Sequence, residues 1–165
     1  MKLLAVDVAY QSAKAVVAGV LFRDWGDESG EAVFISELQE VPDYVSGAFY
    51  QRELPCILKL LKDHQLDPGC IVVDGYVYLD GVARAGLGKY LYDALQARVS
   101  VIGVAKKPFK GIPSQCELFR GCSTKPLFIT AAGLDLTQAK YCIANMHGPY
   151  RLPTLLKEVD RLCRG

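Results

Sequence analysis

Ile71-Val72-Val73-Asp74-Gly75 is a short run of β-branched residues that ends in an acid and a glycine. It follows Pro68-Gly69, and its length and composition are typical of a strand that is buried on both faces. An ionised carboxylate at the end of such a strand is costly unless it is paired or bound to a metal. Asp74 therefore predicts a functional site at the carboxyl end of this strand.

Two further acids lie within apolar patterns. Asp7 interrupts the strand pattern Leu3-Leu4-Ala5-Val6-Asp7-Val8-Ala9. Glu53 falls close to the apolar stripe of a helical pattern between residues 47 and 64. Hydrolysis of a phosphodiester by two divalent ions requires several converging carboxylates, whose oxygen atoms suit Mg²⁺ or Mn²⁺. If Asp7, Glu53 and Asp74 converge, they form a metal cage.

Hydrophobic periodicity and turn residues predict the other elements. Three strands joined by short turns predict an antiparallel meander, and the alternation of helices and strands after it predicts a mixed α/β sheet with helices on its faces. The last strand is expected at an edge of the sheet, and residues 106–125 are expected to form either a β-hairpin or a functional loop. The expected strands are residues 2–9, 13–22, 32–38, 71–74, 99–105 and 126–131, and the expected helices are residues 47–64, 84–98, 135–146 and 153–163.

The composition predicts one compact domain spanning residues 1–165. Hydrophobic residues make up 51% of the chain and charged residues 22%, which excludes the disordered and coiled-coil classes. The formal net charge of +1 provides no global attraction to nucleic acid, so any such contact depends on a local basic patch. The dense candidate is Lys106-Lys107-Pro108-Phe109-Lys110.

The sequence also predicts a soluble cytoplasmic protein with reduced thiols. No apolar stretch approaches the roughly 18 residues of a membrane-spanning helix, and the first residues begin a strand rather than a leader pattern. The six cysteines include no C-x-x-C pair and lie mostly in apolar patterns, which favours buried free thiols over disulfides or zinc ligands.

Four sequence motifs, spread over most of the chain, resemble those of a known family. They are Val6-Asp7-Val8-Ala9-Tyr10, then Tyr44-Val45-Ser46-Gly47 leading to Arg52-Glu53, then Val73-Asp74-Gly75, then Ile102-Gly103-Val104-Ala105-Lys106. In this order they resemble the endonuclease V family. The resemblance implies a ribonuclease H-like fold, in which three antiparallel strands precede parallel strands and helices cover both faces. It also implies a Mg²⁺-dependent endonuclease, with Mn²⁺ as a substitute, that cuts DNA or RNA one nucleotide beyond inosine on the 3′ side.

The resemblance implies roles for individual residues as well. Carried over position by position, Asp7, Glu53 and Asp74 are the catalytic metal ligands. Lys106 is then the cation that offsets charge developing near the scissile phosphate. The residues expected to contact the substrate are Tyr44, as the aromatic wedge that opens the duplex, together with Gly75 and Arg84.

The recognition segments depart from the family's pattern. The chain has Asp43-Tyr44-Val45-Ser46 where the family has Pro-Tyr-Ile-Pro, and residues 76–84 lack the family's His-Pro-Arg run. The family's late histidine also has no counterpart, and Asp135 is the acid expected to replace it at the metal site.

These departures leave two alternatives to the inosine-specific enzyme. One is a non-catalytic nucleic-acid-binding module of the same fold, and the other is a nuclease that acts on a different nucleic-acid structure. Asp80 distinguishes the first alternative from an enzyme. A side chain directed into the acid cluster indicates a rebuilt active site, whereas one directed to solvent favours the non-catalytic module.

Overall fold

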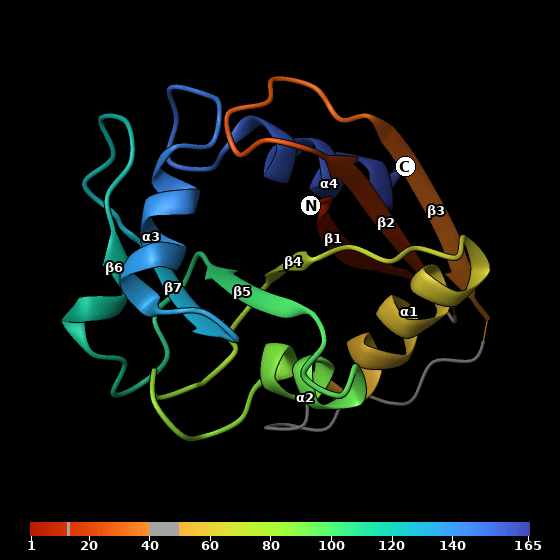
Figure 1. The fold of residues 1–165 in the computed structure, drawn as a ribbon, viewed down its shortest axis with the longest axis horizontal. Helices are drawn as coiled ribbons and strands as arrows, with labels where there is room; N and C mark the ends of the chain where they lie inside the picture. The colour runs from red at the N-terminus through yellow and green to blue at the C-terminus, as the bar shows by residue number, and fades with distance from the viewer. Residues whose placement is uncertain (13, 40–49) are drawn as a thin grey trace.

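Seven strands form one mixed β-sheet in residues 1–12, 14–39 and 50–165, the part of the chain that the computed structural model describes (Figure 1). The strands are β1 (Leu3–Gln11), β2 (Lys14–Phe22), β3 (Ala32–Leu38), β4 (Cys70–Asp74), β5 (Ser100–Ala105), β6 (Glu117–Leu118) and β7 (Leu127–Ala132). Their order across the sheet is β3-β2-β1-β4-β5-β7-β6. The first three strands are antiparallel, whereas β4 and β5 run parallel to β1. The predicted mixed sheet, with a meander followed by parallel strands, is confirmed.

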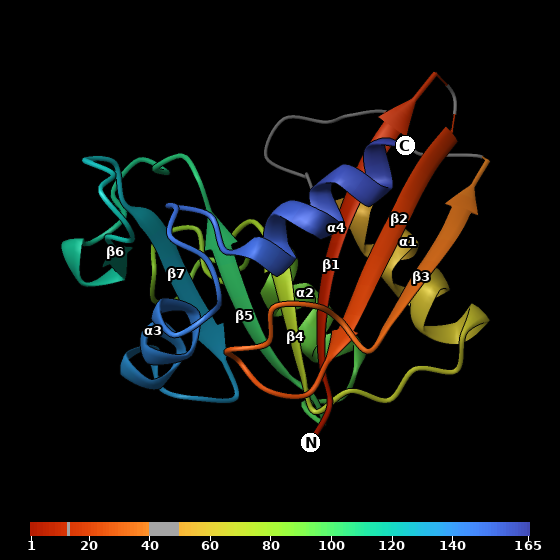
Figure 2. The ribbon, with the colours of Figure 1, turned by 90° about the horizontal axis from the view of Figure 1, so that it is seen from above.

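Helices cover both faces of this sheet (Figure 2). The helices α1 (Tyr50–Asp63) and α2 (Leu87–Ala94) pack on one face, and α3 (Leu136–Ala144) and α4 (Thr154–Arg164) pack on the other. Because successive side chains of a strand point to opposite faces, β1 contributes Leu3 and Ala5 to the α4 side and Leu4 and Val6 to the α1 side. The strands are therefore apolar at consecutive positions, so a buried acid among them is conspicuous.

The sequence analysis made predictions about the cysteines and about membrane-spanning helices. All six cysteines are free, and four of them are buried. Within the described residues, no helix combines the length and apolar character needed to cross a bilayer.

The strand expected at an edge of the sheet is an interior strand. β7 lies between β5 and β6, and its Leu127 and Ile129 are fully buried. The edge is formed by β6, which pairs antiparallel with the start of β7 and follows a short 3₁₀ helix at Ser114–Cys116. The segment 106–125 therefore contains one arm of a hairpin that the periodicity did not resolve, because a two-residue strand is too short to show alternation.

The helix expected at residues 84–98 is shorter, and α2 spans only Leu87–Ala94. Gln96 and Ala97 both adopt a left-handed backbone, with φ of 58°, and this conformation cannot continue a right-handed helix. Before the helix, Gly86 has an extended backbone and donates its N–H to the carbonyl of Val77. The residues preceding α2 thus belong to a loop that follows Asp74.

Candidate active site

Asp7 and Asp74 lie side by side at the carboxyl ends of two neighbouring parallel strands. The register pairs Val6 of β1 with Val73 of β4, so the next residue on each strand is an aspartate. Alternation along each strand turns both carboxylates toward the face that α4 covers. Since neighbouring strands are only about 4.8 Å apart, the two carboxylates repel each other when both are ionised.

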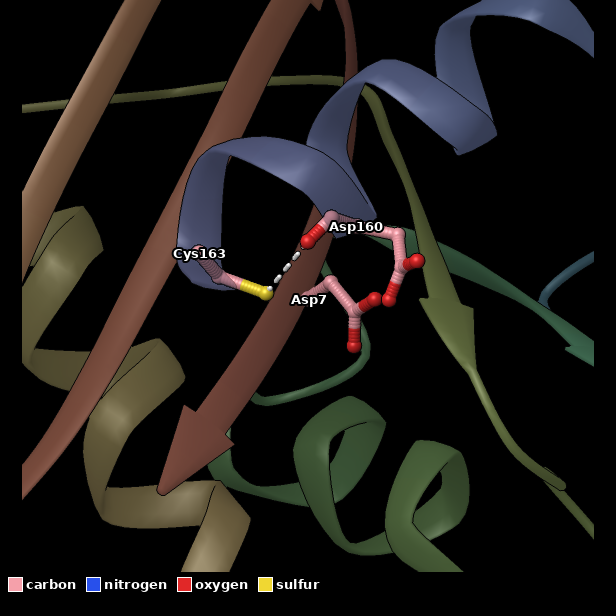
Figure 3. Close-up of side chains that lie close together, drawn as sticks. All are labelled: Asp7, Asp160 and Cys163. Carbon is pink, nitrogen blue, oxygen red and sulfur yellow. Dashed lines mark hydrogen bonds between the residues drawn. The ribbon is translucent and has the colours of Figure 1, made fainter. Parts of the chain in front are cut away.

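Asp160 of α4 brings another carboxylate to the same place (Figure 3). One ligand atom from each of Asp7, Asp160 and Cys163 lies within 4.8 Å of the other two. The Nε of Arg164 donates a hydrogen bond of 2.9 Å to Oδ1 of Asp160. The residues of α4 that pack against the sheet are Leu155, Leu156, Val159 and Cys163. Asp160 therefore borders the apolar stripe of an amphipathic helix and faces the end of β1.

The expectation that Asp135 supplies an acid to this site is wrong. β7 runs antiparallel to β5, so the residues that follow β7 lie beside the start of β5, at the opposite end of the strands from Asp74. Asp135 is exposed there, just before α3. Asp160 is the acid that the sequence analysis missed. Its position directly after Val159 in the C-terminal helical pattern was the available signal, but that pattern alone does not say which strand end the helix covers.

Lys106 follows β5 and brings a cation to the same end of the sheet. Its Nζ lies 3.7 Å from Oδ2 of Asp74, and the two side chains are 38% and 39% exposed. Burial raises the pKa of Asp74, while the positive charge of Lys106 works in the opposite direction. One pocket joins these groups, and its lining includes Asp7, Asp74, Lys106, Asp160, Leu152 and Leu156.

Glu53 approaches from α1, on the other face of the sheet. Its side chain is only 6% exposed. Burial, followed by the negative charges of Asp7 and Asp74, raises the pKa of Glu53 to about 9. The structure thus places Glu53 within electrostatic range of both strand acids, although it does not line the pocket that they share with Asp160.

The pKa values of Asp7 and Asp160 are shifted in opposite directions. Asp7 is 8% exposed, and burial together with the charge of Asp74 raises its pKa to about 7. The backbone N–H of Val8, which donates to Oδ1 of Asp7 at 2.9 Å, only partly opposes this shift. Burial of Asp160 also disfavours its ionisation, but hydrogen bonds from Arg164 and from Asp7 hold its pKa below the ordinary value. Asp7 is therefore the protonated partner and Asp160 the ionised one.

This donor set fits a hard divalent cation. Crowded carboxylates that hold protons at neutral pH gain a counter-charge when such a cation replaces those protons, and Mg²⁺ and Mn²⁺ prefer oxygen ligands. The nearby thiol does not belong to the set. Burial and the charges of Asp7 and Asp160 raise the pKa of Cys163 to about 12, so the thiol stays protonated. Its Sγ donates to the backbone carbonyl of Asp160 at 3.2 Å (Figure 3).

Gly75 and Arg84, two of the residues expected at the substrate, belong to the loop after β4. Gly75 has a φ of 139°, a backbone conformation that favours glycine, directly beside Asp74. The guanidinium of Arg84 is exposed and lies 5.5 Å from the centre of the Phe109 ring. Tyr76 ties this loop to the segment after Lys106, because its hydroxyl donates to the carbonyl of Lys107 at 2.6 Å. Contact of Gly75 and Arg84 with a substrate stays a prediction, and Tyr44 lies outside the described residues.

Asp80 organises its own loop and does not enter the acid cluster. Its Oδ1 accepts hydrogen bonds of 2.8 to 3.0 Å from the backbone N–H groups of Val82, Ala83 and Arg84. These bonds lower the pKa of Asp80 to about 2. Taken alone, this placement favours the non-catalytic module. Asp160, however, supplies the acid that Asp80 does not, so the site is still built from several carboxylates.

Replacing Asp80 by alanine is expected to loosen the loop without changing metal binding. The amide protons of Val82, Ala83 and Arg84 lose their common acceptor, so their hydrogen exchange should accelerate by about tenfold or more, because a hydrogen bond to a charged group contributes about 1.5 kcal/mol or more. Exchange measured by NMR and a Mn²⁺ titration of the same variant check this. Weaker Mn²⁺ binding in Asp80→Ala would show instead that Asp80 belongs to the cation site.

A mixed sheet that has helices on both faces and carboxylates at neighbouring strand ends places the chain in the ribonuclease H-like fold class. The family model for Endonuclease V matches residues 2–128 of the chain. The chain belongs to the endonuclease V family, and it is a nuclease. Endonuclease V of Streptomyces avermitilis is 32% identical to it, over 99% of this chain and 79% of that protein. Endonuclease V of Streptomyces coelicolor is 28% identical, over 99% of this chain and 78% of that protein.

Solved structures show the same fold. The crystal structure of endonuclease V from Streptomyces avermitilis superposes with a TM-score of 0.78 at 28% identity, covering 99% of this chain and 80% of that one. Ciona intestinalis endonuclease V, in complex with a 24mer DNA that contains an inosine followed by a ribo-adenosine, superposes with a TM-score of 0.80 at 19% identity. That match covers 99% of this chain and 84% of the Ciona chain.

Proposed function

We propose that this protein is a Mg²⁺-dependent endonuclease that cuts DNA or RNA one nucleotide beyond inosine on the 3′ side. The observation that carries the proposal is the convergence of Asp7, Asp74 and Asp160 with Lys106 on one pocket. Family membership supports metal-dependent cleavage of nucleic acid. The Ciona relative, which was crystallised with inosine-containing DNA, supports inosine as the recognised base.

The residues present fit a divalent cation held by Asp7, Glu53, Asp74 and Asp160, with Glu53 approaching from α1. When bound, such a cation supplies Lewis-acid chemistry and lowers the pKa of water. The carboxylates are held in place because their strands and helices pack on both sides of the sheet. To hold the cation, Asp7 would have to give up its proton, since a ligating carboxylate must be ionised.

Lys106 acts on the phosphate in this proposal. Its partly exposed Nζ stands beside Asp74, where it can offset negative charge that grows on the phosphoryl oxygens in the transition state. A lysine provides this as a mobile point charge, and its ion pair with Asp74 holds the side chain toward the pocket before substrate arrives. The apolar side chains of Leu152 and Leu156 limit water on the α4 side of the same pocket.

The test is cleavage of single-stranded and duplex oligonucleotides, in DNA and RNA versions, each with and without one inosine. We expect Mg²⁺- or Mn²⁺-dependent cleavage one nucleotide 3′ to the inosine, and at least tenfold slower cleavage of strands without inosine. Products are resolved on a denaturing gel. Flap and junction substrates without inosine are tested in parallel, and preferential cleavage of these would replace this proposal with a nuclease of different substrate. The absence of any metal-dependent cleavage would overturn it.

A further inference from the structure

Arg151 connects the segment that precedes α4 to the backbone of Lys106. Its Nη2 donates hydrogen bonds to the carbonyl of Lys106 and, at 2.7 Å, to the carbonyl of Pro126. Its Nε donates to the same Pro126 carbonyl at 3.3 Å. One planar guanidinium thus joins the residue that follows β5 to the residue that precedes β7. Hydrogen bonds from a charged donor of this kind are about twice as strong as neutral ones.

The backbone at Lys106 needs such a donor because the strand ladder ends there. The last pair between β5 and β7 is Ala105 with Phe128, so Lys106 has no ladder partner. Pro126 cannot extend the ladder because proline has no backbone N–H. Among the described residues, Arg151 is the side chain that donates to the carbonyls of both Lys106 and Pro126.

Arg120 holds the segment that presents Arg151. Its side chain, in a residue only 6% exposed, donates to four backbone carbonyls at 2.7 to 3.3 Å. These carbonyls belong to Met146, Gly148, Tyr150 and Arg151. A buried cation with several acceptors fixes its surroundings firmly, because each lost bond would leave it poorly compensated. Arg120 therefore holds the backbone that carries the guanidinium of Arg151.

We propose that Arg151 is a positioning residue for Lys106: by holding the Lys106 carbonyl, it sets where the Lys106 ammonium stands relative to Asp74 and the scissile phosphate. The inference rests on the proposed function, because it assigns Lys106 its role in cleavage. Arg151 acts through the backbone and not by touching the substrate. Loss of Arg151 consequently affects the rate of the chemical step and leaves oligonucleotide and metal affinities unchanged.

A double-mutant cycle tests this inference. The variants are Arg151→Met, Lys106→Met and the double variant, with Arg98→Met as the matched control, since Arg98 is exposed and precedes β5 at the other end of the strand. Single-turnover cleavage, oligonucleotide affinity, Mn²⁺ affinity and thermal unfolding are measured for each protein. Arg151→Lys is included because lysine keeps the charge but loses the planar fork, and it serves as the folded alternative if Arg151→Met is unstable.

We expect Arg151→Met to slow cleavage about 10- to 100-fold, as a displacement of roughly 1 Å does, with oligonucleotide and Mn²⁺ affinities changed less than threefold. In the Lys106→Met background, the same substitution should slow cleavage less than threefold further, because the group it positions is gone. Arg151→Lys should restore only part of the rate, and Arg98→Met should match the wild type.

Three results would overturn the inference: additive effects of the two substitutions, weaker oligonucleotide binding by Arg151→Met, or full activity of Lys106→Met. Failure of the proposed function looks different, because the wild-type protein itself would then fail to cleave at inosine.

Discussion

Asp7→Asn is expected to remove metal-dependent cleavage while making the metal-free protein more stable at pH 8. Asparagine keeps the shape of Asp7 but cannot carry its negative charge, so the cation loses an ionised ligand at the centre of the cluster. We expect cleavage to fall by about 10³-fold or more, as for other groups that act as a unit. Single-turnover cleavage in saturating Mg²⁺ measures this loss.

The gain in stability has a separate cause. The pKa of Asp7 is raised to about 7, so at pH 8 the folded metal-free protein carries an unfavourable buried charge that the unfolded chain does not. A pKa raised from 3.8 to about 7 corresponds to roughly 4 kcal/mol. The neutral amide of the Asp7→Asn variant is free of this penalty, and the melting temperature should rise by about 5 to 10 °C.

The control for Asp7→Asn is Asp93→Asn, at an exposed carboxylate of α2 that pairs with Lys89 on the helix surface. It should change neither cleavage nor the melting temperature appreciably, since exposed ion pairs contribute little. Lower stability of Asp7→Asn in EDTA would contradict the expected burial of charge. Near-normal cleavage by this variant would remove Asp7 from the metal site.

The second large effect is a steep rise of metal affinity with pH. A cation competes with protons for carboxylates, and each ligand that must lose a proton contributes about a tenfold change in apparent affinity per pH unit below its pKa. Asp7, with a pKa of about 7, contributes to the pH dependence of the affinity below pH 7. Glu53, with a pKa of about 9, contributes to it up to pH 9. From pH 6 to 7 we expect about a hundredfold tighter Mn²⁺ binding, and about tenfold more from pH 7 to 8.

The same raised pKa values also make the metal-free protein less stable as the pH rises. Both pKa values are raised on folding, so between the ordinary carboxyl pKa and about 9 the folded state binds more protons than the unfolded chain. Stability without metal is therefore full below the ordinary carboxyl pKa and is lost as the pH rises through 7 and toward 9. Saturating Mg²⁺ or Mn²⁺ should flatten this decline, because the cation takes the place of the protons.

Calorimetric Mn²⁺ titrations at several pH values, in buffers of different ionisation enthalpy, measure both the affinity and the number of protons released. Glu53→Gln should remove the dependence above pH 7 and keep the part due to Asp7. If affinity levels off at pH 7 in the wild type, Glu53 is not deprotonated on binding and is not a ligand. A pH-independent affinity would rule out the protonated cluster altogether.

Much of the candidate site was accessible from sequence because it depends on strand ends. Asp7 and Asp74 each follow an apolar run, and the carboxyl ends of neighbouring parallel strands meet at one edge of a sheet, so their proximity follows once the strand order is known. Lys106, at the end of the next strand, is placed by the same rule. The structure brings these three residues together as the motif order indicates.

The position of Asp160 could not be predicted from strand ends. It lies on a helix more than 80 residues after Asp74, and its place depends on how α4 crosses β1 and β2. Helical periodicity predicts which residues of α4 face the sheet, but the crossing is set by packing between elements far apart in the chain. Asp135 is expected from its position to replace the family's late histidine, yet β7 is antiparallel to β5 and carries Asp135 to the opposite end of the sheet.

The sequence by itself determined the longer strands and the helices in their order, the two strand-end aspartates and the family, because apolar periodicity and short motifs are local properties of the chain. The tertiary structure alone decided that Asp160 completes the acid cluster, that Asp80 serves its own loop and that Arg151 holds Lys106. The contacts of Asp160 and Arg151 join distant segments, whereas those of Asp80 are local to its loop. The free energies of the long-range contacts depend on burial, charge and hydrogen-bond geometry that exist only after the sheet has assembled and the helices have packed on it.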